Sequence, residues 1–229
     1  MERKKVVVLT GAGISAESGL QTFRDGDGLW ENHRIEDVAT PDAWRRDPEL
    51  VLRFYNMRRA ACLAAKPNAA HIGLAKLEEK HDVVIVTQNI DDLHERAGSS
   101  NVLHLHGEIT KMRSVLDDEK LYPFDREIQI GDKALDGGQF RPHVVWFGEA
   151  VPNIEIAFPL VNEWAEIIVL IGSSLAVYPA AGLLKYASAH IPKYVLDRRI
   201  PDVNGIENIT KIEKKATEGI VDLLNFLHY

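Results

Sequence analysis

Short apolar runs alternate with helical patterns along most of the chain. Uninterrupted apolar runs of four or five residues are typical of strands that are buried on both faces of a parallel sheet. The sequence predicts strands at residues 6–9, 83–86, 102–106, 144–147, 167–171 and 194–196. Because these strands alternate with helices, we expect an α/β fold with a doubly wound parallel sheet.

Helix signals are clearest in the first half of the chain. Asp47 is a suitable N-cap and Pro48 suits the first helical position. The apolar residues that follow at helical spacing are Leu50, Val51, Phe54, Met57 and Ala61. Pro67 and Asn68 end this helix before a second one begins, and residues 218–227 predict a closing amphipathic helix.

Two stretches depart from this alternation. Residues 25–44 mix glycines, acids and aromatics, which predicts a loop with short helical pieces that covers a ligand. Residues 108–142 are charged and weakly periodic, which is typical of a small insert in a larger domain. The length of 229 residues fits one large domain with such an insert.

Charge and cysteine content argue against several classes of protein. The net charge of −7 argues against a general nucleic-acid binder. Cys62 is the only cysteine, so no intrachain disulfide can form, as is usual in a reducing compartment. No apolar run approaches transmembrane length, and the basic N-terminal residues lead into a run too short for a signal peptide. We therefore expect a cytoplasmic protein without nucleic-acid or membrane partners.

Small and polar residues follow four of the predicted strands. The motifs are TGAGIS (10–15), TQNIDD (87–92), HLHGE (104–108) and IGSS (171–174). Ligands of open α/β sheets bind beyond the carboxyl ends of the strands, so we expect these motifs to meet at one site. Gly11 and Gly13 allow a tight turn close to a ligand, and a helix that begins after them would direct amide groups at a phosphate.

Five segments of the chain resemble the sirtuin family of NAD-dependent protein-lysine deacylases, and they occur in the order in which the family has them. They are residues 11–24 (GAGISAESGLQTFR), 87–98 (TQNIDDLHERAG), 104–107 (HLHG), 141–149 (RPHVVWFGE) and 171–181 (IGSSLAVYPAA). The resemblance implies a Rossmann-type NAD-binding domain of residues 1–27, 72–107 and 142–229. A smaller domain would comprise residues of about 28–71 and 108–141, with the acyl-lysine of a protein substrate between the two. We expect a monomer.

The resemblance also implies which residues hold NAD. The residues expected along the dinucleotide and its mobile loop are Gly11, Ala12, Gly13, Phe23 and Arg24. Those expected around the nicotinamide and its ribose are Gln88, Asn89, Ile90 and Asp91. Phosphate or ribose oxygens would contact Gly172, Ser173 and Ser174, and the adenine would lie beside Ala216. Asp197 stands where the family has an asparagine, which leaves ribose recognition there open.

His106, Asn89 and Asp91 are the catalytic candidates. In sirtuin-like chemistry the acyl oxygen attacks the anomeric carbon as nicotinamide leaves, and a neutral histidine helps to deprotonate a ribose hydroxyl. Histidine suits this role because its ordinary pKa lies near neutral pH. The products would be nicotinamide, free lysine and O-acyl-ADP-ribose. A metal site on His94, His104 and His106 is the weaker alternative, because no acidic partner is evident in the sequence. For His71 we expect a structural role at the start of its helix.

The insert lacks a feature of most sirtuins, two pairs of cysteines that bind zinc. No cysteine occurs from residue 63 to residue 229, so a thiolate zinc site cannot form and we expect no metal. Apolar contacts would then have to stabilise the insert. The candidates are Met112, Val115, Leu121, Tyr122, Phe124 and Ile128.

Tyr55 and Arg58 share one face of their predicted helix. They resemble the Tyr-x-x-Arg pair of desuccinylase-type sirtuins, and Ala39 matches the small residue that accompanies it. Arginine offers a bidentate fork to a carboxylate, so the pair would select succinyl-, malonyl- or glutaryl-lysine over acetyl-lysine. Without this context, Arg58 would be interpreted as a surface arginine and Tyr55 as a packing aromatic. The resemblance further places Phe147, Gly148, Glu149 and Val177 beside the substrate.

Three other functions remain open from the sequence. A protein ADP-ribosyltransferase would use the same NAD pocket with a different acceptor. A non-catalytic sensor of NAD or ADP-ribose would not need Asn89, Asp91 and His106 together. A Rossmann dehydrogenase is disfavoured, because no acidic residue follows the glycine turn at the usual distance in a clear second strand.

Overall fold

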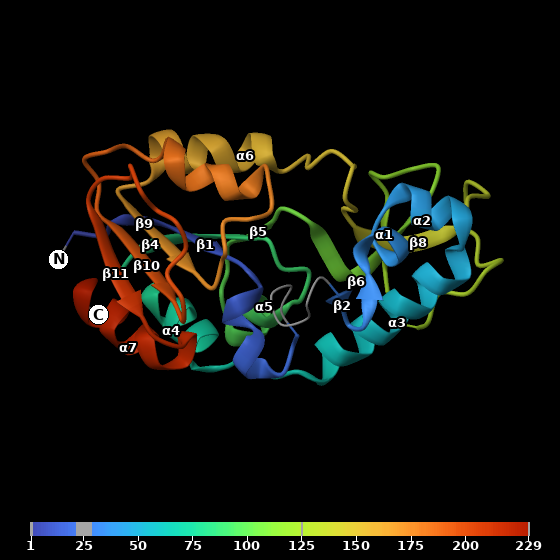
Figure 1. The fold of residues 1–229 in the computed structure, drawn as a ribbon, viewed down its shortest axis with the longest axis horizontal. Coiled ribbons are helices and arrows are strands. Elements are labelled where there is room, and N and C mark those ends of the chain that lie inside the picture. The colour runs from blue at the N-terminus through green and yellow to red at the C-terminus, as the bar shows by residue number, and fades with distance from the viewer. Residues whose placement is uncertain (1, 22–28, 125, 229) are drawn as a thin grey trace.

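The computed structural model describes residues 2–21, 29–124 and 126–228 (Figure 1). Phe23 and Arg24, two of the predicted NAD contacts, lie outside these ranges. The strands are β1 (Lys5–Thr10), β2 (Leu29–Trp30), β3 (His33–Arg34), β4 (Asp82–Thr87), β5 (Val102–His104), β6 (Gly107–Ser114), β7 (Leu121–Pro123), β8 (Phe140–Val144), β9 (Ile167–Ile171), β10 (Lys193–Asp197) and β11 (Ile209–Glu213). The α-helices are α1 (Ile35–Val38), α2 (Pro41–Arg46), α3 (Pro48–Ala64), α4 (Ala69–Leu77), α5 (Leu93–Ala97), α6 (Ile154–Pro159) and α7 (Ala216–Phe226). One π-helical turn, η3 (Leu160–Trp164), and three 3₁₀ segments, η1 (Ala12–Ile14), η2 (Ala16–Ser18) and η4 (Ala180–Tyr186), complete the elements.

Six of the described strands form one parallel sheet in the order β11-β10-β9-β1-β4-β5. Val8 of β1 is opposite Ile85 of β4 on one side and Val169 of β9 on the other. The chain extends from β1 to β5, returns to β9 and then extends to β11, so the strand order reverses beside β1. This confirms the predicted doubly wound fold and puts the ligand crevice at the carboxyl end of β1. Strand β11 was not predicted from the sequence, and β5 ends at His104, two residues earlier than predicted.

Helices cover both faces of this sheet (Figure 1). Val6 and Val8 pack with the cluster that includes α4 and α7, whereas Val7 and Leu9 pack with α6, η3 and η4 on the other face. These four β1 side chains are at most 3% exposed. Burial of such a side chain contributes about 1.5–3 kcal/mol, so β1 anchors both layers of the core.

Two glycine turns contact each other at the ends of β1 and β9. The Gly11 and Gly13 amides donate to the carbonyls of Ile171 and Gly172, at 3.1 and 2.8 Å. Gly172 has a φ of +63°, and a Cβ there would lie 2.2 Å from the Ile14 nitrogen, so the contact requires glycine.

The prediction of a helix after this turn is wrong. Residues 12–18 form the 3₁₀ segments η1 and η2, which end at Gly19 with a φ of 89°. Serine and glycine disfavour a helix interior, and three glycines and two serines occur between positions 11 and 19. The proposed phosphate site at a helix N-terminus therefore does not form at this turn.

A second unit lies beside the carboxyl edge of the main sheet, at the right of Figure 1. In the described part of this unit, β7, β6 and β8 form an antiparallel sheet, and α3 packs on β6 and β8. The predicted strand 144–147 is wrong in its bounds, because β8 ends at Val144, where it pairs with Gly107 of β6. Trp146 leaves the sheet and packs against Trp44, with ring centroids 5.6 Å apart. Its burial, not strand pairing, explains the apolar run.

Helix α3 begins as predicted, but its buried face matches the predicted stripe only in part. The Asp47 carboxylate accepts a hydrogen bond from the Leu50 amide at 2.9 Å, which confirms the N-cap. The predicted stripe is wrong at Met57 and Ala61, which are exposed. The buried residues of α3 are Val51, Leu52, Phe54, Tyr55, Arg58 and Cys62. Two apolar clusters share this helix, so its buried face is broader than a single stripe.

The small unit has an apolar core of its own. Its buried members are Leu52, Met112, Phe124, Ile128, Ala134 and Phe140, and Tyr122 packs against them. The prediction that Val115 and Leu121 belong to this core is wrong, because these residues are 41% and 38% exposed. Within the described residues, no group of three or more His, Cys, Asp or Glu side chains is placed to hold a metal. The described helices include none that is long and apolar enough to cross a bilayer.

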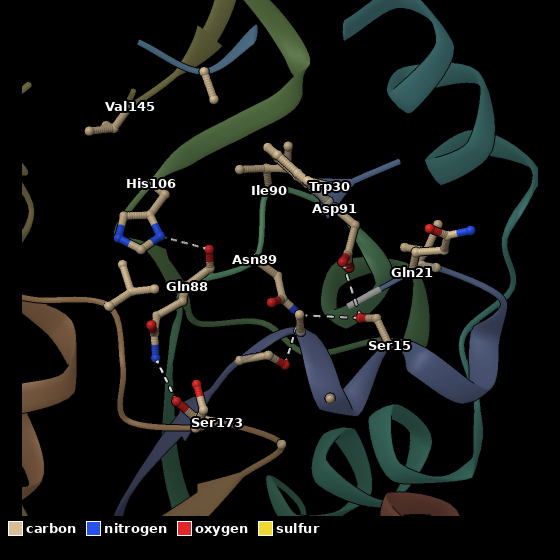
Figure 2. Close-up of a pocket in the computed structure, with 18 of the residues that line it drawn as sticks. Ser15, Gln21, Trp30, Gln88, Asn89, Ile90, Asp91, His106, Val145 and Ser173 are labelled. Atoms are coloured by element: carbon tan, nitrogen blue, oxygen red, sulfur yellow. Dashed lines mark hydrogen bonds between the residues drawn. The ribbon is translucent and has the colours of Figure 1, made fainter. Parts of the chain in front are cut away.

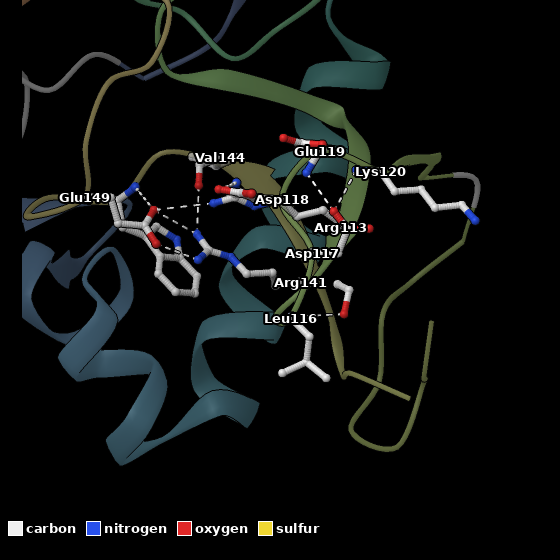
Figure 3. A network of polar contacts seen from close by, with 11 residues as sticks. Arg113, Leu116, Asp117, Asp118, Glu119, Lys120, Arg141, Val144 and Glu149 are labelled. Carbon is white, nitrogen blue, oxygen red and sulfur yellow. Dashed lines mark hydrogen bonds and ion pairs between the residues drawn. The ribbon is translucent and has the colours of Figure 1, made fainter. Parts of the chain in front are cut away.

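An ion-pair network connects β8 to the loop that follows it (Figure 3). Arg141 donates to both carboxylate oxygens of Glu149, at 2.6 and 3.1 Å, and to the Val144 carbonyl at 2.8 Å. Glu149 also accepts from the Trp146 amide at 2.8 Å. Burial opposes ionisation of Glu149, but the contact with Arg141 outweighs it and the pKa of the carboxyl is lowered. These contacts fix residues 145–149 against the small sheet.

Replacing Arg141 with methionine should lower the free energy of unfolding by about 1.5–3 kcal/mol, because Glu149 loses both hydrogen bonds from the guanidinium. The change is measured by urea unfolding. Arg126→Met is the matched control, because the exposed Arg126–Asp132 ion pair lies in the same unit and should contribute about 0–1 kcal/mol. Equal losses in the two variants would contradict the structural role of Arg141.

Candidate active site

A cavity of about 500 Å³ lies at the carboxyl edge of the main sheet, where the small unit contacts it. Every predicted cofactor, catalytic and substrate residue that the structure describes lines this cavity. The four strand-end motifs therefore meet at one place, as expected from a parallel sheet. Residues of the small unit contribute the opposite wall. The volume is typical of a small-molecule or cofactor site.

One wall consists of backbone turns from β1, β9 and β10. Gly11, Ala12 and Gly13 follow β1, whereas Gly172, Ser173 and Ser174 follow β9. Gln88 Nε2 donates to Ser173 Oγ at 3.1 Å, which links the end of β4 to the end of β9. Ala216, the first residue of α7, also lines the cavity. Asp197, at the end of β10, also lines it and accepts a hydrogen bond from the Arg199 amide at 2.9 Å.

Asn89, Asp91 and Ser15 form a buried polar group at the base of the cavity (Figure 2). Ser15 Oγ donates to Asp91 Oδ2 at 3.1 Å, and Asn89 Nδ2 donates to Ser15 Oγ and to the Gly11 carbonyl, each at 3.2 Å. Burial raises the pKa of Asp91, and the hydrogen bonds from the Leu93 amide and from Ser15 oppose this. The three side chains are thus held in fixed orientations by one another.

His106 lies between the end of β5 and the start of β6, and its ring contacts the chain after β4. Nδ1 lies 2.9 Å from the Gln88 carbonyl oxygen (Figure 2). Because a carbonyl only accepts, Nδ1 carries the hydrogen and Nε2 keeps its lone pair. Burial lowers the pKa of His106 below its ordinary value of 6.5 and outweighs the hydrogen bond to Gln88. The imidazole is therefore neutral at neutral pH and can accept a proton at Nε2.

The histidines of the alternative metal site have separate partners. His104 contacts the Asn89 carbonyl at 3.0 Å and Glu95 Oε1 at 2.8 Å. Burial alone would lower the pKa of His104, but the hydrogen bond to Glu95 raises it overall. His94 Nε2 contacts Thr10 Oγ1 at 3.1 Å, and its pKa is lowered well below the ordinary value by burial. Glu95 is an acidic partner that was not predicted from the sequence, and it orients His104 instead of completing a metal site.

His71 has the structural role that was predicted. Its Nδ1 accepts a hydrogen bond from the Asn68 amide at 3.3 Å, which closes a capping box at the start of α4. Burial lowers the pKa of His71 to about 4, so the ring is neutral.

The opposite wall is built from α3, the residue after α1 and the loop after β8. The Phe147 amide donates to the Ala39 carbonyl at 3.0 Å, which connects two of the predicted substrate residues. Tyr55 is 1% exposed, and burial raises the pKa of its phenol, which stays neutral. Arg58 Nη1 donates to Glu31 Oε1, and its Cζ lies 5.0 Å from the centroid of the Trp30 ring. Glu149 was predicted beside the substrate and lines the cavity, but its carboxylate binds Arg141. Its role is therefore structural.

Several cavity residues were not singled out from the sequence. Ser15 lies within the GAGIS motif, and its spacing from Gly11 is the signal that could have identified it. Trp30 and Tyr178 also line the cavity. Trp30 precedes a two-residue turn in a stretch with no clear period, so no local pattern indicates which way its side chain points.

Known proteins resemble this chain along almost its whole length. The model of the Sir2 family matches residues 11–179. A protein of Bacteroides thetaiotaomicron named NAD-dependent protein deacylase is 51% identical over 230 residues, which cover 98% of this chain and 98% of that protein. The crystal structure of a Sir2 homologue–NAD complex is 36% identical, has a TM-score of 0.87, and covers 98% of this chain and 90% of that one.

A third similarity concerns a complex with a peptide. A Sir2 protein with a deacetylated peptide and 3′-O-acetyl ADP ribose is 32% identical, has a TM-score of 0.83, and covers 98% of this chain and 95% of that one. The family model, the relatives and the solved structures agree with the architecture and with the motifs around the cavity. This chain belongs to the Sir2 family.

Proposed function

We propose that this chain is an NAD-dependent protein-lysine deacylase that removes succinyl, malonyl and glutaryl groups in preference to acetyl. NAD dependence and protein deacylation accompany its membership of the Sir2 family and the names of its relatives. The acyl preference is our own inference from Arg58 and Tyr55. The observation that carries the proposal is that the neutral His106 and the buried Arg58 line the same cavity.

The residues at the carboxyl edge fit NAD. The Gly11–Gly13 turn brings backbone to the cavity wall without side chains, which suits a close approach by a dinucleotide. Gln88 and Ser173 are held together beside it. The fixed amide of Asn89 and the carboxyl of Asp91 offer a donor and an acceptor for the nicotinamide and its ribose. When bound, NAD supplies the anomeric carbon that the acyl oxygen attacks.

His106 acts as the general base. Its Nδ1–H is committed to the Gln88 carbonyl, so Nε2 accepts the proton from a ribose hydroxyl. Asn89 and Asp91 orient the reacting groups, since Ser15 fixes both side chains. The hydrogen bond between the Phe147 amide and the Ala39 carbonyl holds these two residues together beside the acyl group.

Arg58 and Tyr55 recognise the distal carboxylate of an acidic acyl chain. Arg58 offers charged donors and Tyr55 a neutral hydroxyl in one wall of the cavity. An acetyl group ends before it reaches such donors and uses none of them. The expectations of a monomer that acts in the cytoplasm, without nucleic-acid or membrane partners, stay predictions, as do the two domain boundaries.

Replacing His106 with asparagine should lower kcat about 100-fold or more, because the general base is lost. The assay follows NAD-dependent removal of acyl groups from a peptide by mass spectrometry. NAD binding and the melting temperature serve as controls and should stay near the wild-type values. Full turnover in the variant would remove His106 from the mechanism and favour another base.

The rate should fall on the acid side as His106 takes up a proton. Because burial lowers the pKa of His106 below 6.5, the neutral form persists to a pH below the usual histidine range. We therefore expect kcat to stay constant around neutral pH and to fall on acidification with a midpoint below the ordinary histidine value. A kcat profile with the melting temperature recorded at each pH measures this. A midpoint above the ordinary histidine value would contradict the assignment.

Arg58→Met should raise KM for a succinyl-lysine peptide about tenfold or more and leave the acetyl-lysine peptide little affected. Both peptides share one sequence and are compared in the same mass-spectrometric assay. Arg53→Met is the matched control, because Arg53 lies on the same helix with its side chain 66% exposed. Equal effects on the two peptides would overturn the acyl preference and leave NAD-dependent deacylation standing.

A further inference from the structure

The guanidinium of Arg58 contacts two neighbouring residues of the β2–β3 hairpin. Nη1 donates to Glu31 Oε1, and the Trp30 ring lies against the guanidinium with Cζ 5.0 Å from its centroid. The side chains of Arg58 and Glu31 are 6% and 19% exposed. A guanidinium so deeply buried requires a compensating negative charge, and Glu31 supplies it before any substrate binds.

One nitrogen of the same guanidinium has no such contact with the described residues. Arg58 Nε is buried and has no hydrogen-bond partner among the described residues. In arginine, Nε and Nη2 form one edge with parallel N–H groups that can bind both oxygens of a carboxylate. Glu31 occupies Nη1, which lies outside that edge. Arg58 is one of the residues that line the cavity, and its Nε–Nη2 edge is the one that the contact with Glu31 leaves for a second carboxylate.

The backbone of the hairpin fixes the position of Glu31. Glu31 and Asn32 form the two-residue turn between β2 and β3, with φ angles of 50° and 64°. These angles suit asparagine but are uncommon for glutamate, and they persist where surrounding contacts fix the chain. The Trp30 and His33 rings pack edge-on against Phe54 of α3, at 5.1 and 5.4 Å. The hairpin is thus docked on the helix that carries Arg58.

We propose that Glu31 is a positioning residue for acyl-chain recognition. Its carboxylate holds Nη1 of Arg58, so that the Nε–Nη2 edge receives the carboxylate of a succinyl, malonyl or glutaryl chain. This inference rests on the proposed function, in which Arg58 binds that carboxylate. An acetyl group makes no contact with the guanidinium, so Glu31 affects acidic acyl groups and leaves acetyl groups unaffected.

The test compares Glu31→Ala and Glu31→Gln with succinyl- and acetyl-lysine versions of one peptide. Glu31→Ala should raise KM for the succinyl peptide about tenfold, because Arg58 loses the contact that orients it. Glu31→Gln keeps an oxygen acceptor for Nη1 and should return KM to within about threefold of wild type. KM for the acetyl peptide should not change in either variant. The melting temperature should fall in both variants, because the buried guanidinium loses its compensating charge, so KM is measured at a temperature at which both remain folded.

Glu36→Gln is the matched control, because it removes one negative charge from the neighbouring helix α1 and its side chain is 68% exposed. It should leave both KM values unchanged. A succinyl KM that is unchanged or lower in Glu31→Ala would overturn the inference, since Glu31 would then be neutral or a competitor for Arg58.

Arg58→Met separates this inference from the proposed function. If Arg58→Met selectively weakens succinyl turnover and Glu31→Ala does not, the positioning role fails and the acyl preference stands. If Arg58→Met affects both peptides equally, the acyl preference itself fails, and the role of Glu31 fails with it.

Discussion

The close contact between the turns that follow β1 and β9 is the constraint on which the site depends. A side chain at Gly13 or Gly172 would overlap the facing backbone, so the two turns meet only as glycines. The Gly13–Gly172 hydrogen bond joins the two halves of the sheet at the point where strand order reverses. Loops that leave the other strands at this edge are then brought together, which is how residues from positions 11 to 216 line one cavity.

Burial determines the chemistry of the groups at that edge. The same low-polarity surroundings lower the pKa of His106 and raise that of Asp91, because each charged form loses hydration. Hydrogen bonds then decide orientation: the Gln88 carbonyl selects the tautomer of His106, and Ser15 connects Asn89 to Asp91. His104 differs because Glu95 compensates its charge, which shows how one acidic neighbour reverses the effect of burial.

The small unit uses ion pairs and apolar packing to hold the opposite wall. Arg141 and Glu149 fix the loop that carries Phe147, and Arg58 and Glu31 join α3 to the β2–β3 hairpin. In both pairs an arginine also lies over a tryptophan ring, Trp146 or Trp30. Such contacts supply directed links between segments that an apolar core of this size would not orient by itself.

The sequence by itself determined the fold class, the positions of five of the six strands of the parallel sheet and the motifs that meet at the cavity. Buried strands give apolar runs that are visible locally, and the carboxyl ends of parallel strands must share one edge, so the motifs at residues 11, 88, 106 and 172 could be placed together in advance. Only the tertiary structure decided which apolar residues outside that sheet are buried and which polar side chains contact each other. The apolar run after Val144 packs against Trp44 and forms no strand, and Met57 is exposed, because burial there depends on which units contact the chain. Likewise the partners of Arg58, His104 and Glu149 come from distant or irregular segments, and no local period encodes a contact between side chains that only folding brings within reach.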